Sequence, residues 1–303
     1  MMRLVLAAVT ALSMVSTPST AQDRVTLGWG RFFSNDALGD GQDRWRTGSY
    51  AISRVRGVDW TGALPDRFGE ILEFRLRADT IAPENLEDPA ANDRRYAGLI
   101  TLGLHSQLAF SGFEANVGAD LGIVGPQTGI GRFQSWVHDT MGLGEIAALD
   151  TQIDDAVYLT VSGEIARRFA LGDRVELRPY VAAQAGIETL VRVGGDIVIG
   201  DFGRDDLMLR DSTTGHRYRG VEGARVTGVS IMLGADLAQV FGSALLPDSG
   251  ATELSDTRHR LRAGVHWQGQ KASAFYGLTY LSKEFEQQDE GQFVGALNLN
   301  IRF

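Results

Sequence analysis

GQFVGALNLNIRF, residues 291–303, is the stretch that decides the fold. Side chains in a β-strand point alternately to its two faces, so this stretch divides into an apolar and a polar set. These sets are Phe293, Leu297, Leu299, Ile301 and Phe303 on one face, and Asn298, Asn300 and Arg302 on the other. A strand with lipid on one face has this pattern, and a terminal aromatic residue is typical of the closing strand of an outer-membrane barrel. An amphipathic strand can also end a soluble protein.

The other end of the chain, residues 1–21, has the features of a secretory signal peptide. Arg3 precedes an apolar core of about a dozen residues, and a small-residue cleavage site ends at Ala21. That core is too short to span a bilayer, and no apolar run of about 18 residues follows it. Closed barrels and helices are the structures that satisfy all backbone polar groups in hydrocarbon. We therefore expect residues 22–303 to form one outer-membrane β-barrel.

Composition agrees with this prediction without deciding it. A hydrophobic content of 44% is ordinary for a soluble domain, but lipid-facing and lumen-facing residues alternate in a barrel, so its mean hydropathy also stays near zero. The absence of cysteine excludes a disulfide framework. Removing the signal peptide leaves 28 basic and 38 acidic residues, a net charge of −10. This acidic balance argues against nucleic acid as a partner.

Strand-like segments recur along the whole mature chain, separated by polar or glycine-rich turns. An even number of strands fits a single-chain antiparallel barrel with both termini on the periplasmic side. The sequence predicts twelve: 25–33, 48–56, 70–80, 95–110, 112–123, 156–168, 174–188, 190–200, 226–241, 258–269, 271–282 and 292–303. The long connection 201–225, rich in Asp, Arg, Gly and Thr, could either cover a site or extend freely.

Two of these strands have one fully apolar and one strongly polar face. In 70–80, Glu73, Arg75, Arg77 and Asp79 alternate with apolar residues. In 260–269, the polar face carries Arg260, Arg262, His266 and Gln268, opposite Leu261, Ala263, Val265 and Trp267. Charged side chains on the inward face require either a water-filled lumen or ion pairs with one another.

One connection, 125–145, departs from the strand pattern. Its sequence GPQTGIGRFQSWVHDTMGLGE has apolar residues three and four positions apart, which predicts a short amphipathic helix: Phe133, Trp136, Val137 and Met141. Gly142 can end this helix. Counting strands up and down from a periplasmic N-terminus places the helix on the extracellular side. We expect its apolar stripe to pack on the barrel rim or to enter the lipid headgroups.

The first predicted extracellular loop, SNDALGDGQDRWRTG, is rich in oxygen-bearing side chains. Asn35, Asp36, Asp40 and Asp43 stand at short spacing, and Thr47 adds a hydroxyl. Hard oxygen ligands suit calcium, although the spacing is not that of an EF-hand. The alternative is a loop that merely turns the chain, because Asn, Asp and Gly dominate turns.

The helix supplies a second polar group. Gln134 and His138 are four residues apart and therefore project from one helix face, beside the apolar stripe. An imidazole can take a proton from water, and the resulting hydroxide can attack an ester carbonyl. A calcium ion held by Asn35, Asp36 and their neighbours could stabilise the oxyanion. A rim position without chemistry is the alternative for His138.

In combination, these residues resemble the outer-membrane lipid A 3′-O-deacylase family over essentially the whole mature chain. The resemblance depends on several short motifs in a fixed order. They are Asn35-Asp36, Asp43-Arg44 with Thr47-Gly48, Tyr96-Ala97-Gly98, Gly125-Pro126 followed by Gln134 and His138, and the terminal Phe303.

The resemblance implies a monomeric twelve-stranded barrel that acts on lipid A, or lipopolysaccharide, among the outer-membrane lipids. It implies a phospholipase A-like hydrolase that uses calcium and removes the 3′-linked acyl group. Asn35, Asp36 and Thr47 would form the calcium and oxyanion region, Gln134 would support it, and His138 would be the general base. Asp43, Arg44 and Glu145 are weaker candidates for substrate contact.

The chain departs from the family pattern in the loop after the third strand. Family members can carry a basic residue there, but IAPENLEDPAAND, residues 81–93, is acidic and has no lysine. Glu145 also stands about one residue later than the pattern. Two alternatives therefore remain: a barrel of this fold that acts on another acylated lipid or is inactive, and a non-enzymatic pore or structural barrel.

Overall fold

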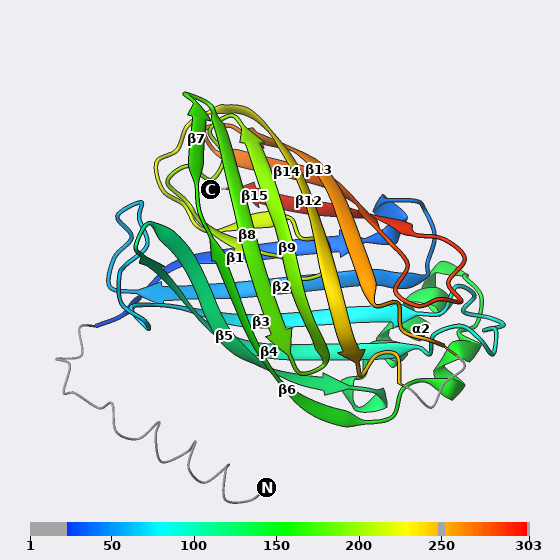
Figure 1. Cartoon of the computed structure of the whole chain (residues 1–303). Coiled ribbons are helices and arrows are strands. Elements are labelled where there is room, and N and C mark those ends of the chain that lie inside the picture. The colour runs from blue at the N-terminus through cyan, green and yellow to red at the C-terminus, as the bar shows by residue number, and fades with distance from the viewer. Residues whose placement is uncertain (1–22, 248–251, 302–303) are drawn as a thin grey trace, which may run out of the picture.

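The computed structural model describes residues 23–247 and 252–301, which form a closed antiparallel β-barrel (Figure 1). The predicted signal peptide, 1–21, and the terminal Phe303 lie outside the described residues. Strands that follow one another in the wall are hydrogen-bonded neighbours. The wall strands are β1 (Val25–Asn35), β2 (Trp45–Gly57), β3 (Ile71–Ala82), β4 (Ala97–Phe110), β5 (Phe113–Val124), β6 (Ala156–Ala166), β7 (Phe169–Gly172), β8 (Val175–Ala185), β9 (Glu188–Ile199), β12 (Gly228–Ser243), β13 (Thr257–Gln268), β14 (Ala272–Leu281) and β15 (Gln292–Ile301).

The wall contains twelve strands across the described ranges, as the alternation predicts. β6 and β7 are two parts of one strand, because both pair with β8: Ala166 lies opposite Tyr180, and Phe169 opposite Leu177. Pairing of β6 with β8 also completes the circle. β10 (Leu207–Arg210) and β11 (Arg217–Val221) form a separate two-stranded sheet.

The barrel has two distinct ends. The helix end carries the loops after β1, β3, β5 and β12 and before β15, together with α2 (Ile130–Met141) and the 3₁₀ turns η1 (Asp36–Leu38), η2 (Pro126–Thr128) and η3 (Ala147–Thr151). The turn end holds the start of β1 and the tight β4–β5 and β13–β14 turns (Figure 1). Across the described residues, none of the helices has both the length and the apolar character that crossing a membrane requires.

Side chains alternate between the outer wall and the lumen, as predicted. On β13, Leu261, Val265 and Trp267 are 48–56% exposed, whereas Arg260 and Arg262 are each 5% exposed. Phe293, Leu299 and Ile301 of β15 are likewise exposed. An outward apolar belt over inward charges is the arrangement that a transmembrane barrel needs.

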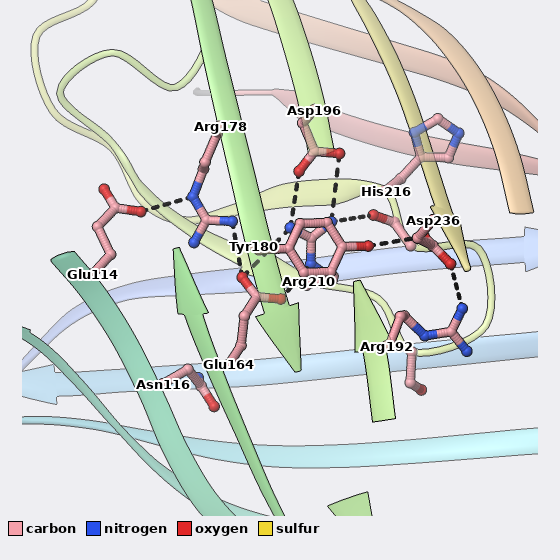
Figure 2. A network of polar contacts seen from close by, with 12 residues as sticks. Glu114, Asn116, Glu164, Arg178, Tyr180, Arg192, Asp196, Arg210, His216 and Asp236 are labelled. Atoms are coloured by element: carbon pink, nitrogen blue, oxygen red, sulfur yellow. Dashed lines mark hydrogen bonds and ion pairs between the residues drawn. The ribbon is translucent and has the colours of Figure 1, made fainter. Parts of the chain in front are cut away.

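The inward charges pair with one another. Arg178 donates to Glu114 at 2.8 Å and to Glu164 at 2.8 Å, and Arg210 donates to Glu164 at 2.6 Å and to Asp196 at 2.8 Å (Figure 2). Each of these carboxylates comes from a different strand, so the ion pairs link β5, β6 and β9 across the lumen. Pairing offsets much of the cost of placing charges away from bulk water.

The β10–β11 hairpin lies inside the lumen near the turn end. Tyr218 stacks on Phe32 of β1 with ring centroids 5.1 Å apart, and its hydroxyl is 3.1 Å from Ser53 Oγ of β2. A Cβ added at Gly28 would lie 2.3 Å from the carbonyl oxygen of Gly220, so glycine permits this close approach. The connection 201–225 therefore fills the barrel, and neither covers the helix end nor extends freely.

The seam between β1 and β15 is short. In the described part of both strands, pairing comprises only Phe33 with Leu297, Ser34 with Ala296 and Asn35 with Gly295, near the helix end. On the turn-end side of these three pairs, the Asn298 side chain donates to the carbonyl oxygen of Arg31. Neighbouring strands elsewhere pair over longer stretches, such as ten residue pairs between β14 and β15.

Candidate active site

The predicted helix is present and ends where predicted. α2 spans Ile130–Met141 between Gly129 and Gly142, which both have left-handed backbone angles, with φ of 73° and 68°. The Gly142 N–H reaches back to the carbonyl oxygen of Asp139, and the Leu143 N–H to that of His138. Glycine adopts this backbone conformation without a steric penalty, which explains why the helix begins and ends here.

Opposite faces of α2 have opposite character. Phe133, Trp136 and Met141 are 61–68% exposed, so the apolar stripe does not pack on the barrel rim. His138 is buried, at 8% exposure, and Gln134 is half-buried beside it. The helix thus directs its polar pair toward the barrel and its apolar residues away from it.

Both ring nitrogens of His138 have an oxygen neighbour. Nδ1 lies 3.0 Å from the carbonyl oxygen of Gly144, and Nε2 lies 3.2 Å from Asp43 Oδ2. A carbonyl oxygen can only accept a hydrogen bond, so Nδ1 carries the proton. Nε2 is then the nitrogen that can take up a proton, and the Asp43 carboxylate stabilises the imidazolium that results.

Gln134 belongs to the same cluster. Tyr96 Oη donates to Gln134 Oε1 at 2.8 Å, and Gln134 Nε2 lies 3.4 Å from Asp43 Oδ2. Asp43 therefore contacts both of the predicted helix residues, and Tyr96 fixes the orientation of the amide. The sequence identified Tyr96 only as part of a motif, and it assigned Asp43 to weak substrate contact rather than to His138.

The predicted calcium residues lie at the end of the β1–β2 pair. Asn35 is opposite Gly48, so Asp36 at the start of η1 and Thr47 of β2 are the residues next to this pair in the chain. Asn35 Oδ1 accepts from the Ala37 N–H at 2.9 Å and begins η1. Asp36 Oδ2 accepts the Arg44 N–H at 2.7 Å, which joins this group to the His138 cluster because Asp43 and Arg44 are consecutive.

Two buried oxygens in this group have no hydrogen-bond partner in the described chain: Asp36 Oδ1 and Thr47 Oγ1. Asp36 is 1% exposed, and its burial, with the nearby charges of Asp43 and Asp40, raises its pKa to about 8 despite the Arg44 N–H, which lowers it. Unpaired hard oxygens and accumulated negative charge fit a calcium ion. Over the described ranges, no three His, Cys, Asp or Glu residues form a metal-binding cluster, so backbone or amide oxygens and water would have to complete the coordination.

Arg44 and Glu145, two of the weaker candidates for substrate contact, lie in different surroundings. Arg44 is held by three carboxylates, with Nη1 3.1 Å from Glu84 and Nη2 2.8 Å from Glu290 and 3.6 Å from Asp40. Its pKa is raised because these acids outweigh the opposing effect of burial. Glu145 is exposed, and it is the carbonyl of the preceding residue that contacts His138.

The acidic loop after β3 reaches the same region. A Cβ added at Gly144 would lie 1.5 Å from Glu87 Oε1, so the Glu87 side chain packs directly against the residue that orients His138. Together with the Glu84 contact to Arg44, this places the loop 81–93 at the candidate site. It brings carboxylates there rather than the basic residue that the family pattern can include.

Comparisons with known proteins found a matching family and similar solved structures. A family model described as "Outer membrane protein LpxR" matches residues 4–303. The solved structure of LpxR from Salmonella typhimurium is 17% identical and superposes with a TM-score of 0.76, covering 91% of this chain and 100% of that one. The β domain of the Bordetella autotransporter BrkA is 13% identical with a TM-score of 0.42, covering 91% and 99%. The search of curated proteins gave no match.

Proposed function

The chain belongs to the LpxR family of outer membrane proteins, and from that premise we propose that it is a calcium-dependent hydrolase of lipid A. It removes the 3′-linked acyl or acyloxyacyl group in the outer leaflet, with the helix end of the barrel on the extracellular side. The observation that carries this proposal is the buried His138, fixed through Nδ1 to the Gly144 carbonyl, with Nε2 beside Asp43.

The mechanism uses His138 as the general base. Nδ1–H donates to the Gly144 carbonyl, so Nε2 takes a proton from water as the oxygen of that water attacks the ester carbonyl carbon. The imidazolium then returns the proton to the departing alkoxide as the carbon–oxygen ester bond breaks. The products are a free fatty acid and a hydroxyl group, and the enzyme is unchanged.

Asp36, Asn35 and Thr47 would hold the calcium ion, because Asp36 Oδ1 and Thr47 Oγ1 are buried and unpaired. When bound, the ion would supply positive charge for the ester oxyanion. Gln134 keeps Asp43 beside the imidazole, and Tyr96 keeps Gln134 in place. The exposed Phe133, Trp136 and Met141 would enter the outer-leaflet interface and bring the polar face of α2 to the lipid.

The test is mass spectrometry of lipid A from cells that produce the protein. We expect His138→Ala to abolish the loss of the 3′ chain, a decrease of about 100- to 10,000-fold in rate, because it removes the general base. Asp139→Asn, on the exposed side of the same helix, is the matched control and should retain activity. Unchanged deacylation by His138→Ala in a correctly folded barrel would remove His138 from the mechanism.

A second candidate substrate is a phospholipid. Arg44 is already surrounded by Glu84, Glu290 and Asp40, and the loop 81–93 adds acids, so Arg44 is not free to bind the phosphates of lipid A. A fatty acid released from phospholipid vesicles but not from lipid A would favour this alternative over lipid A deacylation.

A further inference from the structure

Between the β10–β11 hairpin and the wall strands lies a cavity of about 490 Å³ inside the barrel. Its lining is strongly charged, and arginine is the only basic residue type in it other than histidine. Ten arginines contribute: Arg46, Arg75, Arg77, Arg168, Arg178, Arg192, Arg210, Arg217, Arg258 and Arg260. The cavity is separate from the candidate active site, since His138, Asp43 and Asp36 are not part of its lining.

Nine of these ten guanidinium groups have a carboxylate partner. Examples are Arg46 with Glu284 at 2.7 Å, Arg75 with Glu73 at 2.7 Å, and Arg258 with Glu188 at 2.7 Å. Arg217, the first residue of β11, is the exception: it makes neither an ion pair nor a side-chain hydrogen bond within the described part of the chain.

The carboxylates near Arg217 are already shared. Three acids near the hairpin each accept from two guanidinium groups. Glu114 is shared by Arg168 and Arg178, Glu164 by Arg178 and Arg210, and Asp196 by Arg210 and Arg262. Figure 2 shows this chain of contacts from Glu114 through Arg178, Glu164 and Arg210 to Asp196. Arg217 therefore adds a positive charge that these acids do not neutralise.

The charges that act on Arg217 are mainly like charges. The like charges of Arg178 and Arg168 act on it more strongly than the opposite charges of Glu114 and Asp196. Arg178 uses Nε and Nη1 for its two carboxylates, which leaves its Nη2 without an acceptor in the described residues. Arg217 is half-buried at the cavity wall, and the planar set of N–H donors of a guanidinium group matches the oxygens of an oxyanion.

We propose that Arg217, with the free N–H group of Arg178, forms a binding site for a small inorganic oxyanion of the phosphate type in this cavity. The ligand is a free anion that enters from water rather than a lipid phosphate. Acyl chains contact the outer wall, whereas Arg217 and Arg178 face the lumen behind it. The bound anion would tie the β10–β11 hairpin to β8 and supply the negative charge that the protein does not provide.

The first experiment measures binding of inorganic phosphate to the full barrel, purified in an uncharged detergent without phosphate or sulfate. We expect saturable binding in isothermal titration calorimetry and a rise in the unfolding temperature with phosphate concentration. Arg217→Met should weaken the affinity at least about tenfold. The control is Arg67→Met, because Arg67 has an 85% exposed side chain on the turn-end loop and should leave binding unchanged.

A second measurement covers the case in which Arg217→Met does not fold. Crystals of the unaltered protein grown with selenate should give an anomalous peak beside Arg217 and Arg178. Equal phosphate affinity in Arg217→Met and the unaltered barrel, no saturable binding, or selenate only at the outer surface would each overturn the proposal. A titration with solubilised lipid A in place of phosphate distinguishes a lipid phosphate from a free anion. A site for a lipid phosphate would bind lipid A with the same affinity in Arg217→Met and in the unaltered barrel.

Discussion

At the residue scale, the candidate site depends on one aspartate that the sequence did not connect to the histidine. Gln134 and His138 could be placed together because helix geometry relates positions four apart. Asp43 and His138 are 95 residues apart in the chain and meet only because the β1–β2 loop and α2 lie at the same end of the barrel. No local period carries that information, so the partner of the imidazole could not be predicted.

Asp43 has a testable part in the chemistry. In Asp43→Asn, a neutral amide would replace the carboxylate that stabilises the imidazolium. The contact of Gln134 Nε2 with this side chain would also weaken. We expect kcat to fall about 10- to 100-fold, the equivalent of one hydrogen bond to a charged group, with KM little changed. Steady-state kinetics on solubilised lipid A would measure this. A rise in KM alone would instead assign Asp43 to substrate binding, as the sequence suggested.

Asp36 gives a pH dependence to the proposed calcium site. Its pKa in the metal-free fold, about 8, is above the ordinary value of 3.8, so the folded protein binds more protons than the unfolded chain between these values. The contribution of Asp36 to stability without metal therefore falls as pH rises through that window. Calcium must displace this proton, so its affinity should rise with pH up to about 8 and then level off.

Calorimetry in two buffers of different ionisation enthalpy would count the protons released on calcium binding. We expect close to one proton at pH 6 and few above pH 9. In Asp36→Asn, which cannot release a proton from this position, the buffer dependence should disappear. Calcium affinity that is independent of pH in the unaltered protein would show that Asp36 is not a ligand.

At the element scale, the twelve wall strands could be read from the sequence, whereas the lumenal hairpin could not. Each wall strand alternates because lipid and lumen meet its two faces. β10 and β11 span four and five residues, and both of their faces meet protein, so no apolar belt marks them. Their segment has the charged and glycine-rich composition of a surface loop.

The position of α2 depends on a small residue in the wall. A Cβ at Gly98 would lie 2.6 Å from Thr128 Oγ1 and 2.8 Å from Ile130 Cβ. Gly98→Val should therefore displace the start of α2, at a cost of about 1–3 kcal/mol for overpacking, and lower the deacylation rate while the barrel stays folded. Electrophoretic mobility of unheated samples and lipid A mass spectrometry would measure the two effects.

Gly172→Ala is the matched control for Gly98→Val. Gly172 lies in a wall strand at the turn end, and nothing stands within 4 Å of a Cβ added there. This variant should retain both the folded barrel and the activity. Full activity in Gly98→Val would mean that α2 tolerates displacement and that its position does not set the rate.

At the scale of the whole molecule, the β10–β11 hairpin plugs part of the lumen of the barrel. Leu207, Leu209, Tyr218 and Val221 of the hairpin form a buried apolar cluster with Phe32, Val55 and Phe275 of the wall. The paired charges line the cavity that remains in the lumen. A small-diameter barrel filled in this way is suited to holding a surface site rather than to conducting solutes.

Planar-bilayer recording tests this property directly. We expect the purified protein to show no large steady conductance, and a variant with residues 204–222 replaced by a short glycine–serine linker to show one, because the cluster that fills the lumen is gone. If that variant fails to fold, Leu209→Asp offers a milder disruption of the same cluster. A large steady conductance in the unaltered protein would favour the pore.

The three-pair seam between β1 and β15 has a consequence for biogenesis. Because Tyr218 of the hairpin stacks on Phe32 of β1, we expect the hairpin to dock on this strand before β1 and β15 pair. The sheet would then close around the docked hairpin, and the pairing of β1 with β15 would be the last step of folding. A disulfide engineered across that seam would then form late during assembly, after the insert has become resistant to proteolysis.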